Sequence, residues 1–496
     1  MTATTEARPR PHRPATGHPG GLSGCRAVLD PDVLVVPEPH GPAAYPSTLL
    51  VSTTAAVAVR LRPAATRALG GGRTVEIADR TSHTLAAALL TRGLAHPVWD
   101  PSLAPLHDVT VVVPVKDRPD HLARLLDALG AAPDLATVLV VDDGSDGPDQ
   151  IHDVVRAAGA RVRLVRHQVC RGPAAARNTG LRQSSTPFVA FVDSDVVPTP
   201  DALARLRRHL DDESVGLVAP RVSALEEAAG WIATYERYRS PLDMGPRPGP
   251  VRPGARISYV CSATVLARRE ALGTGFDESM PVAEDVDAVW RMVDAGWTVR
   301  YCPDAVVHHD HRVSPRAWWA RRTFYGTGAA PLWHRHGDRI APVRLTPLTA
   351  LAVVGLLLRG RVGAAAIGAA VLTHLGLQVT RRDGLAHRRP ALALRITART
   401  LAGCAEQVAG SVNRHHWPVH LAAALIWPRA RHTVLVCALA EGALDYRRTG
   451  PQQSFLPYLA ARRLDDLAYG WGLWRGAVRG RAWGALRPHL VHHARA

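Results

Sequence analysis

The sequence predicts an α/β fold built around a parallel sheet, and two observations carry this prediction. Apolar runs of four to seven residues alternate with amphipathic helical segments between residues 109 and 192, which is the spacing of strand–helix–strand crossovers. Two of these runs end in paired aspartates, Asp142-Asp143 and Asp193-Ser194-Asp195. Since ligands of open α/β sheets bind at the carboxyl ends of the strands, these aspartates are the first candidates for a functional site.

The elements of this region follow one another with short polar connections. Apolar runs predict strands at Val109–Val115, Val138–Val141, Val162–Val165 and Val189–Val192. Helical spacing predicts helices at Asp120–Leu129, Ile151–Ala158 and Ala174–Gln183. A later strand is expected at Val299–Cys302, after a helix that ends near Gly296.

The region before residue 105 divides into two parts. Residues 1–45 are rich in Pro, Gly and Arg without periodicity, which predicts a disordered tail. Residues 46–104 predict a small winged-helix-like module, with a strand at Leu49–Val57 and helices at Pro63–Leu69 and Ser82–Arg92, Ser82 being a candidate N-cap. A structural extension of the next domain is the alternative. No helix here has a base-reading face, so we expect no nucleic-acid partner.

Composition narrows the function classes. The 496 residues carry a formal charge of +17, and Lys116 is the only lysine. An arginine excess of this kind reflects coding composition as readily as nucleic-acid binding, and it also suits a nucleotide, an anionic lipid surface or an acidic peptide. Six cysteines without a C-x-x-C pair argue against a zinc site or a disulfide framework. With no apolar signal-peptide core near the N-terminus, we expect a cytoplasmic protein.

The pair Asp193 and Asp195 predicts a metal site. The two carboxylates lie one residue apart at the end of a buried strand and would repel one another without a cation. Mg²⁺ and Mn²⁺ prefer oxygen ligands, and Mg²⁺ usually bridges protein carboxylates to substrate phosphates. The alternative is a strand-end turn with two solvated aspartates.

Asp142, Asp143 and Arg177 are candidates for nucleotide contacts. A carboxylate past a buried strand can accept hydrogen bonds from a base N–H or from ribose hydroxyls, whereas the alternative is a plain Asp-Gly turn. Arg177 lies in Arg-Gly-Pro-Ala-Ala-Ala-Arg-Asn-Thr-Gly, residues 171–180, where it could face a phosphate. A tightly packed helix start would use the same small residues.

Two further segments carry candidate chemistry. Asp285 lies in Glu284-Asp285-Val286-Asp287 at a predicted helix start, where it is either a capping residue or a general base near the metal. His308, His309 and His311 form a cluster that could supply one more metal ligand. Spacing alone does not decide which histidine is used.

Taken in order, the motifs resemble those of the inverting family 2 glycosyltransferases, which have a GT-A fold. The resemblance covers about Asp108–Arg312 and rests on these stretches: Pro-Val-Lys-Asp-Arg-Pro, Val-Asp-Asp-Gly-Ser, Arg-Gly-Pro-Ala-Ala-Ala-Arg-Asn, Asp-Ser-Asp, Phe-Asp-Glu and Glu-Asp-Val-Asp. It implies a GT-A (nucleotide-diphospho-sugar transferase) domain over residues 105–335. It also implies a metal-dependent hexosyltransferase that acts by a single in-line displacement.

A narrower resemblance is to the mycofactocin-system glycosyltransferases. It rests on Phe324-Tyr325-Gly326-Thr327-Gly328 and Arg335-His336-Gly337, together with the small N-terminal module. That family implies transfer of glucose from UDP-glucose to a peptide-derived redox cofactor, in the presence of Mg²⁺ or Mn²⁺. Ala283 departs from the family, which usually has Gly before Glu-Asp.

The same resemblance assigns roles to single residues. It places the nucleotide along Pro114, Asp117, Asp142, Asp143 and Arg177. Asp193 would hold the ribose and Asp195 the metal and diphosphate. Asp285 would be the base, and His309 the remaining metal ligand.

The C-terminal region, residues 336–496, is expected to be helical and membrane-associated. Leu345–Leu358 and Val362–Thr380 are weakly apolar runs, and the second is only marginal for a membrane span. Trp417, Trp427, Trp471, Trp474 and Trp483 among many arginines suit an anionic surface on the cytoplasmic face, while an ordinary helical bundle is the alternative. A lipid or polysaccharide would be the alternative acceptor, and for either acceptor we expect Trp231–Ser258, which is rich in Pro, Gly and Arg, to line the acceptor site.

Overall fold

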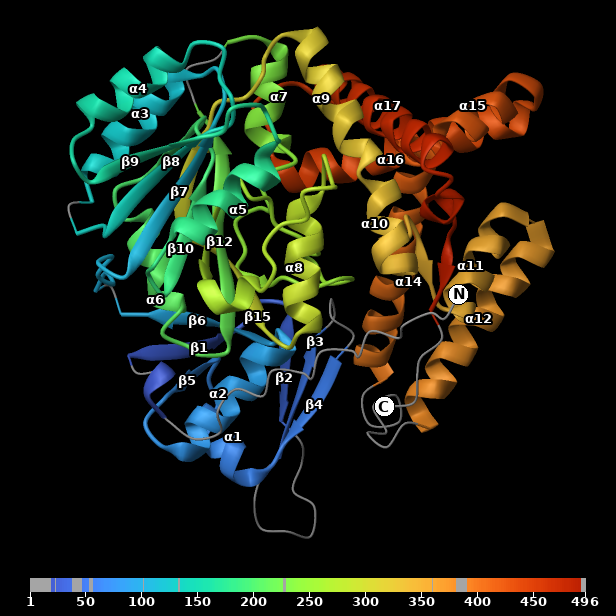
Figure 1. Cartoon of the computed structure of the whole chain (residues 1–496). Helices are drawn as coiled ribbons and strands as arrows, with labels where there is room; N and C mark the ends of the chain where they lie inside the picture. The colour runs from blue at the N-terminus through green and yellow to red at the C-terminus, as the bar shows by residue number, and fades with distance from the viewer. Residues whose placement is uncertain are drawn as a thin grey trace, which may run out of the picture. The chain divides into compact units, whose positions relative to one another are not determined.

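The computed structural model describes residues 19–22, 24–37, 47–52, 57–100, 102–132, 134–225, 229–358, 360–380 and 390–491. The chain forms two compact units (Figure 1). Met1–Ala228 and Arg239–His311 make the α/β unit, and Ala229–Tyr238 with Arg312–Ala496 make the helical unit. The predicted boundary at residue 335 therefore differs from the observed one, which lies at residue 311 and leaves one earlier helix with the helical unit.

The α/β unit is organised on a mixed sheet, which in the described residues has nine strands in the order β11-β15-β12-β14-β10-β7-β8-β9, with β13 paired to β15. These are β7 (Val109–Val115), β8 (Thr137–Asp142), β9 (Val162–Arg166), β10 (Phe188–Val192), β11 (Val196–Pro198), β12 (Val215–Ala224), β13 (Gly249–Pro250), β14 (Thr264–Arg268) and β15 (Thr298–His309). Strands β10, β7, β8 and β9 run parallel, as predicted. Strand β14 pairs antiparallel with both β10 and β12, so the sheet continues beyond the four predicted parallel strands as a mixed sheet.

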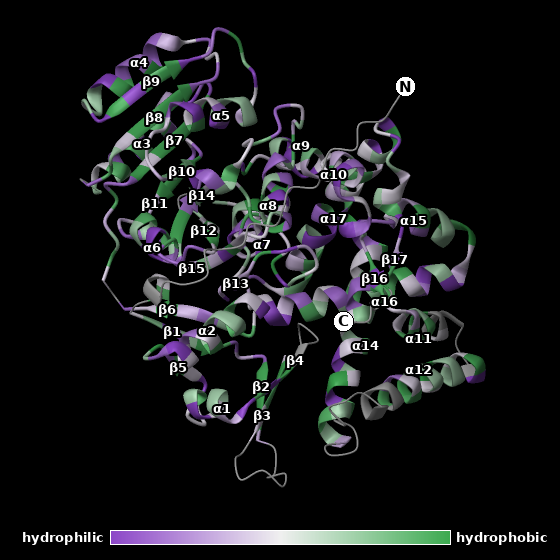
Figure 2. Ribbon diagram, turned by 60° about the horizontal axis from the view of Figure 1, so that its bottom comes forward, coloured by the Kyte–Doolittle hydropathy of each residue, from purple (hydrophilic) through white to green (hydrophobic). Residues whose placement is uncertain are grey.

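Burial explains why the strands form where they do. All five residues of β10 are buried, and β7 and β8 are buried almost throughout, because helices pack against the sheet. The helices of this unit are α3 (Pro119–Gly130), α4 (Pro148–Ala157), α5 (Pro173–Gln183), α6 (Ala202–His209) and α8 (Glu284–Asp294). Helix α5 packs on β7 and β8, while α6 and α8 pack on β15. Figure 2 shows the hydrophobic colouring concentrated on the central strands.

The N-terminal module belongs to the α/β unit and has two small sheets, β5-β1-β6 and β2-β3-β4. Its elements are β1 (Cys25–Leu29), β2 (Val33–Pro37), β3 (Thr48–Ser52), β4 (Val57–Leu61), α1 (Pro63–Leu69), β5 (Thr74–Glu76), α2 (Arg80–Arg92) and β6 (Ala95–Trp99), after a 3₁₀ turn at Pro19–Leu22. The prediction of a disordered tail over 1–45 is wrong for Cys25–Pro37, because two short apolar runs there pair with later strands. Residues 1–18, 23 and 38–46 lie outside the described residues.

Two details of the module correct the prediction. The single strand expected at Leu49–Val57 is instead the pair β3 and β4. Helix α2 begins earlier than expected, because Asp79 is its N-cap and accepts a hydrogen bond from Ser82 N–H (2.7 Å), while the Ser82 hydroxyl accepts one from Asp79 N–H (2.9 Å). Ser82 is thus the third residue of a capping box rather than the cap.

The helical unit contains α7 (Trp231–Arg239), α9 (Pro315–Thr327), α10 (Ala329–His336), α11 (Pro347–Leu358), α12 (Gly360–Thr380), α14 (Pro390–Arg414), α15 (Trp417–Ile426), α16 (Pro428–Thr449) and α17 (Phe455–Arg479), with a short pairing of β16 (Arg344–Leu345) and β17 (His489–Leu490). Helices α9 and α17 pack so closely that a Cβ on Gly472 would lie 1.8 Å from the Thr323 carbonyl oxygen. None of the described helices is long and apolar enough to cross a bilayer. This holds for α12, which contains the run Val362–Thr380 that was considered as a marginal span.

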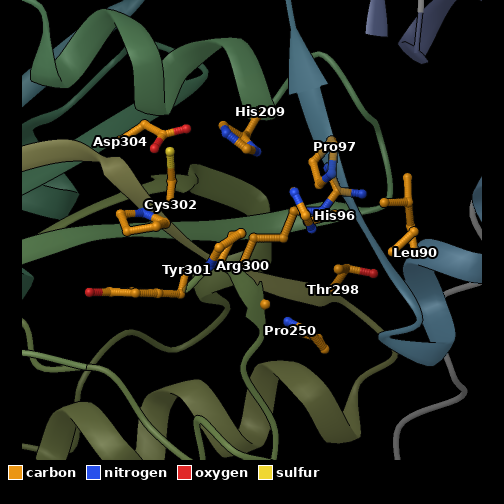
Figure 3. A pocket seen from close by; sticks show the side chains of 14 residues that line it. Leu90, His96, Pro97, His209, Pro250, Thr298, Arg300, Tyr301, Cys302 and Asp304 are labelled. Atoms are coloured by element: carbon orange, nitrogen blue, oxygen red, sulfur yellow. The ribbon is translucent and has the colours of Figure 1, made fainter. Parts of the chain in front are cut away.

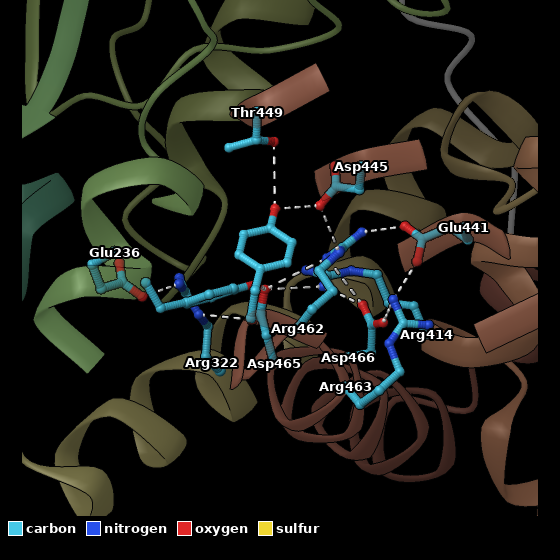
Figure 4. Close-up of polar contacts among 12 residues, drawn as sticks. Glu236, Arg322, Arg414, Glu441, Asp445, Thr449, Arg462, Arg463, Asp465 and Asp466 are labelled. Atoms are coloured by element: carbon cyan, nitrogen blue, oxygen red, sulfur yellow. Dashed lines mark hydrogen bonds and ion pairs between the residues drawn. The ribbon is translucent and has the colours of Figure 1, made fainter. Parts of the chain in front are cut away.

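A buried cluster of charged groups holds this unit together (Figure 4). Arg322 of α9 pairs with Glu236 of α7 and, through Nε at 2.8 Å, with Asp465 of α17. Tyr235 donates a hydrogen bond to Asp465 (3.1 Å). Burial opposes ionisation of Asp465, but Arg322 and Arg414 lower its pKa. Because these charges compensate one another away from water, loss of one partner is expected to destabilise the unit strongly.

Candidate functional site

The loops after β7 and β8 are joined at the carboxyl edge of the sheet. Pro114, in β7, lies opposite Val141 of β8. Asp117 adopts a left-handed conformation (φ 53°), and its N–H donates to the Ser145 hydroxyl (2.9 Å). The Asp117 carboxylate accepts the N–H of Asp146 (2.7 Å), which lowers its pKa. Two residues predicted to lie along a nucleotide therefore border one edge of the sheet.

Asp142 lies at the end of β8 and is fully buried. Its Oδ1 accepts hydrogen bonds from the backbone N–H (2.9 Å) and the hydroxyl (2.6 Å) of Ser145, and its Oδ2 pairs with Arg166. The carboxylate thus shapes the turn after β8, and its oxygens already have protein donors.

Asp143 fixes the following segment, residues 167–172. Its Oδ1 is 2.8 Å from His167 Nδ1 and accepts the Arg171 N–H (2.9 Å), while its Oδ2 accepts the Gly172 N–H (2.8 Å). Burial opposes ionisation of Asp143, but these hydrogen bonds lower its pKa. Asp143 therefore remains an anion that positions the backbone leading into α5.

Arg177 connects the two acidic parts of the site. From α5 it donates through Nη2 to Asp193 (2.7 Å) and through Nη1 to Glu284 (2.9 Å). Its guanidinium lies 5.6 Å from the ring centre of Phe276. Although burial opposes its charge, both carboxylates raise the pKa of Arg177 above its ordinary value. Burial raises the pKa of Asp193, against the opposing charge of Arg177.

Asp195 and His309 are brought together by strand pairing. Antiparallel pairing of β11 with β15 places Val196 opposite His309. As a result, His309 Nε2 lies 3.5 Å from Asp195 Oδ1, while Asp195 Oδ2 pairs with Arg118. Burial opposes ionisation of Asp195, but His309 and Arg118 lower its pKa.

The other histidines of the cluster have different partners. His308 Nδ1 is 3.0 Å from the Ser223 hydroxyl. His311 Nε2 is 2.8 Å from the Ser240 hydroxyl, and its Nδ1 is 2.8 Å from the His309 carbonyl oxygen. The geometry therefore favours His309 over its two neighbours as the partner of Asp195.

Asp285 is the second residue of α8, and the N-cap of this helix, Ala283, has a left-handed backbone (φ 65°). Its Oδ2 accepts the Ser262 N–H (3.1 Å), and its Oδ1 accepts the Val286 N–H (2.8 Å). Burial raises the pKa of Asp285 to about 6, and the charge of Glu284 adds to the effect. A carboxylate that exchanges its proton near neutral pH suits a general base better than a simple helix cap.

The donor set around Asp195 fits a small divalent cation. Asp195 Oδ1 and His309 Nε2 are 3.5 Å apart, near the separation of about 3 Å expected for adjacent octahedral ligands at about 2.0–2.1 Å from a metal. Among the described residues, no three His, Cys, Asp or Glu side chains form a complete metal site. Diphosphate oxygens and water would have to supply the remaining ligands, as is usual for Mg²⁺.

Three residues of the site escaped the sequence analysis. Arg118 pairs with Asp195, Glu284 with Arg177, and His167 with Asp143. Arg118 and Glu284 stand within motifs quoted above, and their charges, opposite to those of Asp195 and Arg177 respectively, are the signal that could have identified them. His167 lies just after β9 and carries no local signal of its own.

A separate cavity of about 30 Å³ lies where strand β6 of the N-terminal module meets β15 (Figure 3). His96, His209 and Arg300 line it, and one nitrogen of each is buried without a hydrogen-bond partner among the described residues. A volume of this size holds about two water molecules. The cavity adjoins Thr298, at the opposite end of β15 from His309, so it is not part of the site above.

Comparison with known proteins places these features in context. Residues 110–276 match the family model described as glycosyl transferase family 2. The chain is 42% identical over 443 residues to the pre-mycofactocin glycosyltransferase of Mycobacterium tuberculosis, in both strains CDC 1551 and H37Rv. That alignment covers 87% of this chain and 92% of the relative.

Other known proteins are similar to the chain at lower identity. The succinoglycan biosynthesis protein ExoU of Rhizobium meliloti is 30% identical over 202 residues, which is 38% of this chain and 58% of ExoU. The mannosyltransferase PcManGT from Pyrobaculum calidifontis, solved in complex with GDP-Man and Mn²⁺, has a TM-score of 0.40 and 21% identity, covering 73% of this chain and 90% of that chain.

Proposed function

Because the chain belongs to the pre-mycofactocin glycosyltransferases and its α/β unit is a GT-A-like family 2 domain, we propose that it transfers glucose from UDP-glucose to a peptide-derived redox cofactor in mycofactocin biosynthesis. The observation that carries this proposal is Asp285. Its pKa is raised to about 6, and Arg177 joins the adjacent Glu284 to Asp193. Base and donor-binding carboxylates thus belong to one connected cluster.

The proposed reaction is one inverting displacement. An acceptor hydroxyl attacks the anomeric carbon and gives its proton to Asp285, a new O–C bond forms, and the bond to the diphosphate oxygen breaks as UDP departs. Pro114, Asp117, Asp143 and Arg177 border the nucleotide, while the buried Asp142 shapes the turn next to it, and Asp193 binds the ribose. Asp195 and His309 would hold Mg²⁺ or Mn²⁺, which when bound offsets the negative charge of the leaving diphosphate.

Arg177 has a positioning role in this proposal. Its pairing with both Asp193 and Glu284 couples the start of α8, which carries Asp285, to the strand end that binds the donor. The Ser262 and Val286 N–H groups orient the Asp285 carboxylate, and each carboxylate oxygen keeps a further lone pair that could accept the proton of the acceptor hydroxyl.

The acceptor decides between two candidate functions. Similarity to the pre-mycofactocin glycosyltransferase over 87% of this chain supports the peptide-derived acceptor. Similarity to the succinoglycan biosynthesis protein ExoU supports a polysaccharide acceptor but covers only 38% of this chain. We also propose that the enzyme works in the cytoplasm, peripherally attached to a membrane, without a nucleic-acid partner.

Purified enzyme should be incubated with either the peptide-derived acceptor or a polyprenyl-linked acceptor, in each case with UDP-glucose or GDP-mannose, and the products should be identified by mass spectrometry. We expect a hexose on the peptide-derived acceptor with UDP-glucose alone, and none with the Asp285→Asn variant. Transfer only to a polyprenyl-linked acceptor would overturn the proposed acceptor, and transfer from GDP-mannose alone would overturn the donor.

A further inference from the structure

Helix α15 is apolar yet covered by little of the protein. Its sequence from Trp417 to Ile426 reads Trp-Pro-Val-His-Leu-Ala-Ala-Ala-Leu-Ile, and none of its residues is buried. The exposed fraction of the side chains is highest at its end, with Leu425 at 73%, Ile426 at 70% and Trp427 at 62%. Monomeric proteins seldom expose such contiguous apolar surface without a binding partner.

The start of α16 continues this surface. Leu435, Val436 and Leu439 are exposed, and their spacing of three and four residues places them on one side of the helix. Helices α15 and α16 pack against each other. We refer to Leu421–Leu439 as the α15–α16 corner.

The corner has a fixed geometry. Trp427 alone separates the two helices, being both the C-cap of α15 and the N-cap of α16. Arg431 donates hydrogen bonds to the carbonyl oxygens of Ala424 (2.7 Å) and Leu425 (3.1 Å), which satisfies the end of α15. At the other end, His416 bonds to the Leu486 carbonyl oxygen (2.7 Å). The base of the corner is therefore anchored in the helical unit, and its tip is held in shape without being covered.

The charge around the corner has one sign. From Gln407 to Ala440 the sequence contains no Asp or Glu. Arg429, Arg431 and His432 lie within the first five residues of α16, beside the apolar tip, and all three are exposed. A tryptophan at the border between apolar and cationic residues is typical of segments that lie in a membrane interface.

We propose that the α15–α16 corner inserts into the headgroup region of an anionic phospholipid bilayer, with Leu425, Ile426 and Trp427 among the acyl chains and the arginines at the phosphates. This inference rests on the peripheral membrane location proposed above and assigns it to one surface. Consecutive residues of a helix are rotated by about 100° from one another, so the exposure of Leu425, Ile426 and Trp427, each above 60%, leaves the tip open on more than one side. A fluid bilayer can surround them, whereas the rigid surface of a second copy would cover one side.

Vesicle co-sedimentation of the full-length protein tests the proposal, using pure phosphatidylcholine or phosphatidylcholine mixed with phosphatidylglycerol. We expect binding to the anionic vesicles, weakened by salt, with each arginine near the lipid surface contributing about fivefold (about 1 kcal/mol). Leu425→Glu should reduce this binding at least tenfold. The matched control is Leu456→Glu, since Leu456 of α17 is 72% exposed and lies outside the corner, and it should bind like the wild type.

Circular dichroism and size-exclusion chromatography with light scattering accompany both variants. If Leu425→Glu binds anionic vesicles as well as the wild type does, the assignment to the corner is overturned, but the membrane location is not. Absence of wild-type binding to either vesicle would overturn both. A dimer that Leu425→Glu converts to a monomer, without vesicle binding, would identify a second copy as the occupant instead. Glucosyl transfer to a water-soluble acceptor, measured separately, should be unchanged in Leu425→Glu.

Discussion

Replacing Asp285 with asparagine should lower the rate of glycosyl transfer and, at about pH 8, raise the free energy of unfolding. The pKa of Asp285 is raised from 3.8 to about 6, and because the folded value lies above the unfolded one, the ionised carboxylate opposes folding at pH above about 6. The difference corresponds to about 3 kcal/mol at neutral pH. The asparagine side chain carries no charge, but its single oxygen can accept only one of the two hydrogen bonds that Asp285 accepts from Ser262 and Val286. The lost hydrogen bond lowers the free energy of unfolding by about 1 kcal/mol. The variant should therefore be about 2 kcal/mol more stable than the wild type at about pH 8.

Transfer should fall in the same variant by about 10²–10⁴-fold, with UDP-glucose affinity near that of the wild type, since general-base assistance is lost. Wild-type transfer should itself decline as the pH drops through about 6. Urea denaturation at about pH 8 and pH 4 measures the stability, and its gain should vanish at the lower pH. Asp153→Asn, on the exposed surface of α4, is the control and should change neither quantity.

Two results would refute this reasoning. If Asp285→Asn is less stable than the wild type at about pH 8, the buried carboxylate is not disfavoured in the folded state. If its transfer rate stays within a few-fold of the wild type, the base is another residue, and Asp287 is the next to test.

Three further predictions concern the neighbouring residues. Asp195→Asn should lower transfer by about 10²–10³-fold, and excess chelator should abolish wild-type transfer; turnover that persists in chelator would exclude a required metal. Arg177→Met leaves Asp193 and Glu284 without their cation and should lower the free energy of unfolding by about 3–5 kcal/mol; a urea-measured loss below about 1 kcal/mol would contradict the buried pairing. Ala283→Gly should remove about 1–2 kcal/mol of left-handed strain against about 0.5–1 kcal/mol of added chain entropy, so thermal unfolding should show no loss of stability.

The first half of the sheet could be predicted because its strands are nearly continuous apolar runs. Strands β7 and β10 are examples of such runs. Parallel strands joined by helices have their carboxyl ends at the same edge of the sheet, so Asp142 and Asp193 could be assigned to one site. Strands β12 and β14 were harder to predict, because their pairing depends on contacts between segments that lie far apart along the chain.

Electrostatic partners were harder to predict than the aspartates themselves. Arg177 reaches Glu284 across 107 positions, and no local pattern encodes such a distance. The choice among the histidines needed the register of β11 on β15, since a shift of one residue would turn His309 to the other side of the sheet. The early strands β1 and β2 were missed because flanking Pro, Gly and Arg concealed two short apolar runs.

The placement of α7 in the helical unit has a consequence for synthesis on the ribosome. Tyr235 meets its partner Asp465 only after another 230 residues have been made, which takes roughly 10–50 s at typical elongation rates. During that interval Tyr235 and Glu236 must remain hydrated while the segment Arg239–His311 folds around β14 and β15. A recombinant fragment ending at His311 would keep α7 in this incomplete state permanently, so its solubility should depend on making that helix polar.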